Sequence, residues 1–162
     1  MSSGDRPYAL APGEGHAIWY RGTLMVVKAA SEQTGGALTV IEHAFPPAFG
    51  APLHLHHRDV EPWYVLEGTV SFTCGDLIFN ATPGAFVYLP RDVPHSFRVG
   101  DTQPAKMLLL SIPAGLEGMF QELGEVAKAP ILPPPPGPPD PERMRSVASK
   151  YGVEILGPPP GR

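Results

Sequence analysis

The sequence predicts an all-β fold, a sandwich or barrel of short strands, with one or two short helices near the C-terminal end. From residue 16 to about residue 112 the chain is a succession of short apolar or alternating runs. Turn-forming pairs such as Gly35-Gly36 and Pro83-Gly84 separate these runs, and many short strands at close spacing are typical of sandwiches and barrels. After Pro113 the apolar residues recur at helical spacing instead.

The expected strands follow one another along this region. They are HAIWY (16–20), TLMVVKA (23–29), ALTVIEHAF (37–45), PWYVL (62–66), TVSFTC (69–74), LIF (77–79), AFVYL (85–89), HSFRV (95–99) and KMLLLSI (106–112). Glycine accepts left-handed backbone, and Asp or Asn side chains hydrogen-bond their own main chain, so the intervening residues favour chain reversal.

Two helices are expected after the strands. Leu116, Met119, Phe120 and Leu123 form one apolar stripe at helical spacing, which would either cover a sheet edge or close the mouth of the barrel as a lid. Residues 130–141 contain eight prolines and favour an extended polyproline II spacer along the surface.

The second helix is expected over residues 141–151. Asp140 is a suitable N-cap, Pro141 suits the first helical position and Gly152 provides a C-terminal stop. The sequence leaves open whether this helix docks on the barrel.

These signals divide the chain into four parts: an N-terminal segment (1–15), the barrel (16–113), a helical segment that covers the barrel (114–129), and a Pro-rich linker with a short C-terminal helix (130–162). At 162 residues, 43% of them hydrophobic, we expect one domain with a sizeable core.

Charge and composition narrow the classes of partner. The net charge is −4, only 17% of residues are charged, and Lys and Arg form no run, so we expect neither nucleic acid nor an anionic membrane as partner. The first residues lack the layout of a signal peptide, and no apolar stretch approaches the roughly 20 residues of a spanning helix, which predicts a cytoplasmic protein. The single cysteine, Cys74, is expected only to pack.

The chemistry is concentrated in the stretch PLHLHHRDVEPWYVLEG. His54 and His56 are two residues apart, so both imidazoles point to the same face of an extended strand. Glu61 follows a four-residue turn, and we expect a hairpin to return its carboxylate beside the histidines. Pro62 restricts Glu61 to extended backbone.

A fourth ligand is expected from the stretch GAFVYLPRDVPHSFRV, where His95 begins a strand after a proline-bounded loop. Three imidazoles and one carboxylate suit one divalent first-row transition metal per chain, and Fe, Mn, Ni, Co, Cu and Zn all accept such ligands. A site that only braces the barrel is the alternative. His57 points to the opposite face of its strand, so a solvent-facing or interface role is expected for it.

These two stretches resemble the two motifs of the cupin superfamily. The first motif, His-x-His, a gap, Glu, a gap of six and Gly, is met by His54, His56, Glu61 and Gly68. The second is met by Gly84, Pro90 and His95, although Asp92 replaces a glycine and Val99 an asparagine. Asp tolerates left-handed backbone, so the turn should survive.

The resemblance implies a double-stranded β-helix (jelly-roll-like) barrel over roughly residues 16 to 112, with the metal inside near one mouth. The flanks are similar to small bacterial cupins described as quercetin dioxygenase-like, so that the resemblance extends over most of the chain. By alternation Trp63 and Val65 share the face of Glu61 and should line a substrate pocket, as should Phe72, Phe97 and Met107. His43 is either a pocket residue or a core histidine.

The basic side chains between residues 38 and 112 fall in expected loops, strand ends or outward positions: Arg58, Arg91, Arg98 and Lys106. An anionic substrate would need a buried cation, so we expect a small apolar or aromatic molecule.

Our leading hypothesis is a metal-dependent dioxygenase that uses O₂ on an enolisable, flavonol-like aromatic, with Glu61 both a ligand and a proton acceptor. The alternatives are a non-catalytic small-molecule binder or sensor and a metal-dependent isomerase or lyase. We also expect a homodimer that pairs through the strands at 16–20 and 23–29.

Overall fold

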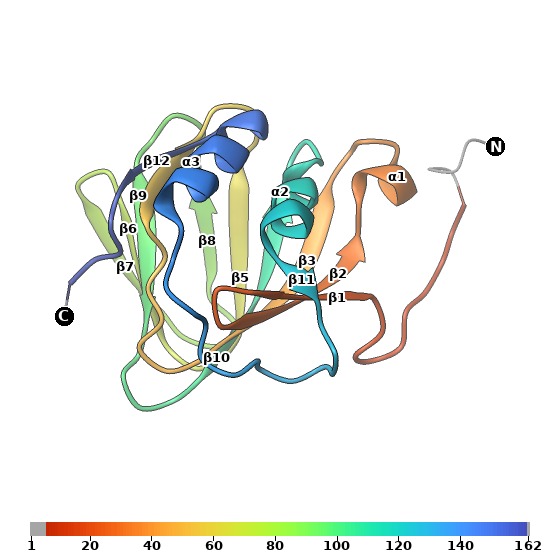
Figure 1. The fold of residues 1–162 in the computed structure, drawn as a ribbon, viewed down its shortest axis with the longest axis horizontal. Coiled ribbons are helices and arrows are strands. Elements are labelled where there is room, and N and C mark those ends of the chain that lie inside the picture. The colour runs from red at the N-terminus through yellow and green to blue at the C-terminus, as the bar shows by residue number, and fades with distance from the viewer. Residues whose placement is uncertain (1–5, 162) are drawn as a thin grey trace.

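The computed structural model describes residues 6–161 and consists of two antiparallel sheets that face each other, with three short helices gathered at one end (Figure 1). The larger sheet has the order β11-β1-β2-β3-β10-β5-β8 and the smaller one the order β12-β4-β9-β6-β7. This arrangement is the expected jelly-roll fold.

The element bounds are as follows. The larger sheet contains β1 (His16–Tyr20), β2 (Thr23–Ala29), β3 (Thr39–Phe45), β5 (Glu61–Glu67), β8 (Phe86–Leu89), β10 (Ala105–Ser111) and β11 (Glu125–Val126). The smaller sheet contains β4 (Leu53–His56), β6 (Val70–Cys74), β7 (Leu77–Ala81), β9 (His95–Val99) and β12 (Val153–Gly157). The helices are α1 (Ser31–Thr34), α2 (Leu116–Leu123) and α3 (Pro141–Lys150).

The core lies between the sheets and is rich in aromatic rings. On β3 and β10 every second residue is buried, as expected for strands with one face on the core. Phe45, Trp63 and Phe97 pack against one another with ring centroids 5.2 to 6.2 Å apart. Trp63 and Phe97 also line the cavity that the metal-ligand candidates His54, His56 and Glu61 share.

The C-terminal segment docks on the barrel, which answers the question that the sequence left open. Asp140 caps α3 by accepting a hydrogen bond from the Arg143 amide at 3.0 Å, as expected. After α3 the chain forms β12, a strand that was not expected, and pairs with β4. Glu122 of α2 accepts hydrogen bonds from Lys150 and Tyr151, which ties α3 to α2.

The expected hairpin between His56 and Glu61 is wrong, because β4 lies in the smaller sheet and β5 in the larger one. The chain crosses between the sheets through residues 57–60. Asp59 in this crossing is buried and binds Ser111, while Val60 forms a bridge with Ile112. Glu61 therefore faces the histidines across the interior.

The strands at 16–20 and 23–29 do not offer the free edge that was expected. β2 lies between β1 and β3, and β11 pairs with β1 through Ile18 and Val126. The chain can return this closely after α2 because Gly124 has no side chain; a Cβ there would lie 2.6 Å from Ile18. Trp19 also donates a hydrogen bond to the carbonyl of Ile131 in the Pro-rich segment.

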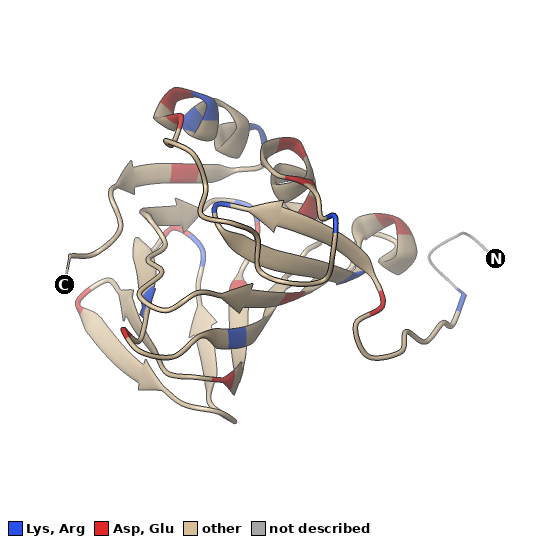
Figure 2. Ribbon diagram, turned by 60° about the horizontal axis from the view of Figure 1, so that its bottom comes forward, with Lys and Arg blue, Asp and Glu red and all other residues tan. Residues whose placement is uncertain are grey.

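Lys and Arg are interspersed with Asp and Glu over the ribbon, and α3 carries both signs (Figure 2). In residues 6–161 no helix is both long and apolar enough to cross a membrane.

Candidate metal centre

Three histidines and one glutamate from three strands converge inside the barrel. β4 and β9 are neighbours with His54 paired to His95, and His56 lies one pleat further along β4. From the opposite sheet, Glu61 places its carboxylate oxygens 3.7 Å from Nε2 of His56 and 3.3 Å from Nε2 of His95. One candidate ligand atom from each of the four residues lies within 4.8 Å of the others.

The hydrogen bonds of the other ring nitrogens fix how these histidines are protonated. Each Nδ1 lies beside an oxygen: 2.7 Å from the carbonyl of Pro52 for His54, 3.0 Å from the carboxylate of Asp59 for His56, and 2.9 Å from the carbonyl of Val93 for His95. A carbonyl oxygen only accepts, so Nδ1 must donate at His54 and His95. The Nε2 lone pairs of those rings are therefore free for a metal.

The donor set fits a divalent cation. Nε2 of His95 is buried and has no hydrogen-bond partner, although it lies beside the Glu61 carboxylate. Lone pairs and a carboxylate that face one point repel one another unless a cation lies between them. Nitrogen and oxygen donors in this proportion suit a first-row divalent metal.

The electrostatics of the site agree with this charge balance. Burial alone would raise the pKa of Glu61, but the surrounding histidines, His56 foremost, outweigh it and lower the pKa to about 2. Burial lowers the pKa of His54 to about 3, and His95 adds to the shift. For His56, burial is outweighed by Glu61 and Asp59, which raise its pKa. Glu61 is thus an anion and His54 a neutral ligand at neutral pH.

A supporting layer of hydrogen bonds was not predicted from the sequence. Asp59 is 5% exposed and accepts hydrogen bonds from Nδ1 of His56 and, at 2.7 Å, from Oγ of Ser111. Trp63 donates its Nε1 hydrogen to Glu61 at 3.1 Å. The available signal for Asp59 was an acidic residue three positions after a ligand histidine. These groups hold the imidazole and the carboxylate in place.

Three of the four candidate ligands, His54, His56 and Glu61, line a narrow apolar cavity of about 60 Å³. Trp63, Phe97 and His43 line it, in line with the sequence-based expectation. Met119 and Phe120, from the stripe that was expected to cover a sheet edge or close the barrel mouth, also line it. The remaining lining residues were not suggested by the sequence: Tyr20, Phe49, Ala51, Pro52, Val153 and Ile155. α2 and β12 thus provide part of the wall, and their apolar residues cover the mouth.

Val65, Phe72 and Met107, which were also expected to line the pocket, lie in the fully buried core and not on the cavity wall as the structure describes it. They do face inward, as alternation predicted. Their strands extend beyond the cavity, however, so these side chains lie in the part of the interior that is filled by packed side chains.

His43 and His57 have separate environments. His43 is buried, and its Nε2 lies 2.8 Å from Oγ of Thr23. His57 points outward, as expected, and lies between the carboxylates of Asp92 and Glu154 at 2.6 and 2.9 Å. Asp92 has a φ of 61°, so the left-handed turn survives the replacement of glycine.

Comparison with known proteins agrees with the fold. The family model "Cupin domain" matches residues 41–112. The chain is 29% identical over 156 residues to quercetin 2,3-dioxygenase of Bacillus subtilis, an alignment that covers 96% of this chain and 44% of the relative. The chain thus spans less than half the length of the curated relatives it matches.

Solved structures show the same fold. The polyketide cyclase RemF from Streptomyces resistomycificus superposes with a TM-score of 0.57 and 20% identity, over 66% of this chain and 80% of that one. An RmlC-like cupin from Shewanella frigidimarina superposes with a TM-score of 0.58 and 18% identity, over 69% and 96% of the two chains. Residues 41–112 accordingly match the cupin domain family, and over most of its length the chain resembles a bacterial quercetin 2,3-dioxygenase.

Proposed function

We propose that this cupin is a metal-dependent dioxygenase that acts on a small, apolar, enolisable aromatic. The observation that carries the proposal is the contrast between the ligand set and its surroundings. Glu61 is the one charged side chain on the cavity wall as described, and aromatic and aliphatic side chains make up most of the rest. The Bacillus quercetin 2,3-dioxygenase provides support at the level of sequence.

The side chains on the cavity wall indicate which chemical class of substrate the site accepts. The cavity lining contains neither Arg nor Lys, and a carboxylate or phosphate moved into an apolar cavity needs such a partner. A neutral aromatic loses little on entry and packs against Trp63, Phe97 and Phe120. An oxygen-bearing aromatic thus fits the site better than a sugar phosphate or a dicarboxylate.

A metal held by His54, His56, Glu61 and His95 would supply a Lewis-acid and redox centre. The chain supplies the remaining functions. Glu61 is an anion at neutral pH and can accept the proton of a substrate hydroxyl through a carboxylate oxygen. Trp63 holds that carboxylate in place, and Met119 and Phe120 add apolar surface to the cavity wall.

The small volume of the cavity is also compatible with functions other than the oxidation of a flavonol. Small-molecule pockets commonly reach about 300 Å³ or more, whereas this one is about 60 Å³, so a three-ring flavonol enters only if the wall at α2 moves. A binder or sensor of smaller molecules uses the same cavity, as would an isomerase or lyase. The polyketide cyclase RemF shares the fold alone.

Oxygen consumption separates these functions. The metal-reconstituted protein is incubated with a panel of flavonols and catechols in an oxygen electrode, beside the metal-free protein. Metal-dependent uptake of O₂ with ring-opened product supports the dioxygenase. Tight binding without turnover indicates a binder, and product formed under nitrogen indicates an isomerase or lyase.

A further inference from the structure

The cavity wall carries a second unpaired polar atom besides the metal ligands. Among residues 6–161, two buried side-chain nitrogen or oxygen atoms lack a hydrogen-bond partner, Nε2 of His95 and Nδ1 of His43. The first belongs to the metal site. The second lies on β3, on a side chain that lines the same cavity.

The hydrogen bonds around His43 determine which of its nitrogens is the acceptor. Oγ of Thr23 donates its single hydrogen to the carbonyl of Tyr20 at 2.6 Å. Nε2 of His43 must then be the donor to that oxygen at 2.8 Å. Burial lowers the pKa of His43 to about 3, so the ring is neutral. Nδ1 is therefore an unpaired lone pair.

Residues 6–161 offer no donor to this lone pair. The nearest ring is that of Phe45, with centroids 3.8 Å apart, and the cross-strand neighbours are Met25 and Met107. The indole N–H of Trp63 is used by Glu61. Buried acceptors are almost always paired in native proteins, and because the His43 side chain lines the cavity, a molecule bound there is the candidate partner of Nδ1.

We propose that Nδ1 of His43 accepts a hydrogen bond from a hydroxyl of the substrate, one remote from the oxygens that bind the metal. This inference rests on the proposed function and narrows it to a class, a neutral single-ring aromatic with two vicinal oxygens and at least one further hydroxyl. The cavity of about 60 Å³ is smaller than the roughly 150 Å³ of a cavity that binds benzene, so among aromatics a single ring requires the least movement of the wall.

The test is a binding measurement that needs no turnover. Protein loaded with Zn²⁺, which is redox-inert, is titrated calorimetrically under nitrogen with catechol, 1,2,3-trihydroxybenzene and 1,2,4-trihydroxybenzene. We expect at least one triol to bind roughly tenfold more tightly than catechol, the effect of one added hydrogen bond. His43→Phe keeps an aromatic ring without the acceptor and should abolish the difference, whereas His43→Gln, which retains an acceptor, should keep part of it.

His57→Phe is the matched control, because it makes the same change outside the cavity. If the unaltered protein binds catechol and both triols equally well, the proposed role of His43 is wrong. The same holds if the difference in affinity survives in His43→Phe. Neither result contradicts the aromatic-substrate proposal. If none of the three compounds binds, the aromatic-substrate proposal fails together with it.

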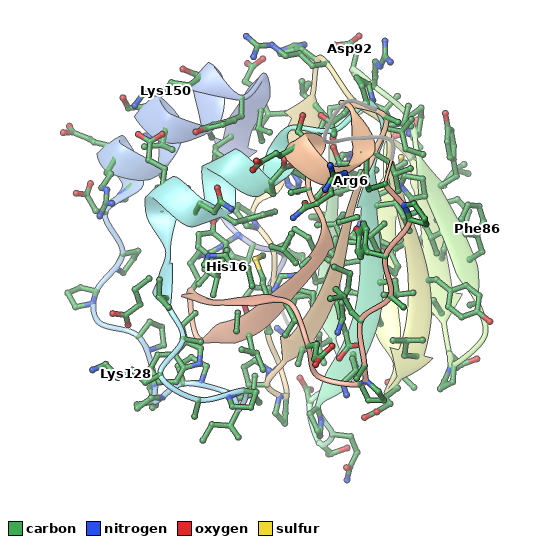
Figure 3. All side chains as sticks on the ribbon, turned by 90° about the vertical axis from the view of Figure 1, so that its right-hand side faces the viewer. Arg6, His16, Phe86, Asp92, Lys128 and Lys150 are labelled. Carbon is green, nitrogen blue, oxygen red and sulfur yellow. The ribbon has the colours of Figure 1, made fainter. Side chains whose placement is uncertain are left out.

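A different observation carries a second inference, about the outer surface of the larger sheet. Six outward apolar side chains lie on adjacent strands, and we call them the outer apolar face: Val40, Tyr64, Phe86, Tyr88, Leu108 and Leu110. The aromatic three are 40%, 62% and 53% exposed, respectively. Phe86 lies on the side of the barrel away from α2 and α3 (Figure 3).

The strand register makes this face continuous. Leu108 pairs with Tyr64, which pairs in turn with Phe86. One pleat away, Leu110 pairs with Val40, and Tyr88 is the outward neighbour of Phe86 on β8. The result is two parallel cross-strand rows of apolar side chains.

At the other end of the same sheet, outward apolar side chains are covered by another part of the chain. Leu24 and Val26 on β2 also point outward, yet they are only 7% and 4% exposed. Residues 130–132 of the Pro-rich segment share a cleft with them. The chain thus covers its own sheet at β2, and in residues 6–161 it leaves β5 and β8 bare.

We infer that a second copy of this chain covers the outer apolar face, sheet against sheet. The six side chains present roughly 400 Å² per copy, which is in the range of the largest apolar patch on a typical monomer, a patch that is often functional. This is about half of what each partner contributes to a standard interface. The rim supplies the rest and carries both signs, with Lys106 between Glu42 and Glu67. Such a rim complements itself across a two-fold axis, whereas its acids disfavour nucleic acid or an anionic membrane.

Light scattering after size exclusion at micromolar concentration tests this interface. We expect a dimer for the unaltered protein and a monomer for the double variant Phe86→Lys, Tyr88→Lys, with thermal stability and metal content retained. Val126→Lys is the control, since Val126 is 69% exposed on β11 beside β1. A monomeric unaltered protein refutes the inference. If Val126→Lys disrupts the dimer and the double variant does not, the inference is wrong and the dimer forms through the N-terminal edge instead.

Discussion

Asp59 offers the most specific test of the candidate metal centre, because it holds the imidazole of His56 in place but is not itself a candidate ligand. It is 5% exposed and accepts hydrogen bonds from Nδ1 of His56 at 3.0 Å and from Oγ of Ser111 at 2.7 Å. Removing the carboxylate leaves Ser111 with a second acceptor, the carbonyl of Pro113. The N–H of His56 loses the only partner that the structure gives it.

The expected magnitudes follow from these contacts. Asp59→Ala should lower the free energy of unfolding of the metal-free protein by about 1–3 kcal/mol, the cost of one buried unsatisfied donor. Asp59→Asn keeps an acceptor but loses the negative charge that makes the imidazole more basic. It should weaken metal binding by roughly 10- to 100-fold, with a smaller loss of stability.

The assay is a competition between the protein and a chromophoric chelator for Zn²⁺, with denaturant unfolding of the metal-free protein alongside. Asp76→Asn is the matched control, because Asp76 is an exposed carboxylate outside the site. If Asp59→Asn and Asp76→Asn bind the metal equally well, the hydrogen bond does not tune His56, and the supporting role of Asp59 is wrong.

Three further predictions concern the ligands and the pH dependence of stability. The double variant His54→Ala, His56→Ala should lose stoichiometric metal yet remain a folded barrel, by elemental analysis and circular dichroism; one metal per chain would contradict the ligand assignment. Glu61→Gln at saturating metal should abolish substrate oxidation, because the amide cannot accept the proton; an unchanged rate would leave Glu61 a ligand only. Burial lowers the pKa of His43 from 6.5 to about 3, so between these values the unfolded state binds the extra proton, and stability falls as the pH falls. Denaturant titrations of the metal-free protein should show a loss from this residue of up to about 1.4 kcal/mol per pH unit, which His43→Phe removes.

The strands and the ligand set could be read from the sequence because both depend on local geometry. A period of two places His54 and His56 on one face wherever that strand lies, and the structure brings both to Glu61 and His95. Alternation also sorted the inward residues of β3, β5 and β10 correctly. It could not say how far along the barrel each one sits, so Val65 and Met107 were expected on a cavity wall that they do not reach.

What required the tertiary structure was every relation between segments distant in sequence. The route from His56 to Glu61 looks like a hairpin locally, and only the buried contacts of Asp59 with Ser111, 52 residues later, turn it into a crossing between sheets. The cavity wall joins Tyr20, Phe120 and Ile155, which no local pattern connects.

The sequence by itself therefore determined the all-β class, the candidate metal-ligand set and the apolar character of the interior, since backbone periodicity and side-chain chemistry are properties of short stretches. Only the tertiary structure decided the size of the cavity, the unpaired nitrogen of His43 and the bare half of the outer sheet. The physical reason is that exposure and hydrogen-bond pairing depend on which other segments pack nearby. At the outer sheet, residues 130–132 pack beside Leu24 and Val26, whereas Phe86 stays 62% exposed.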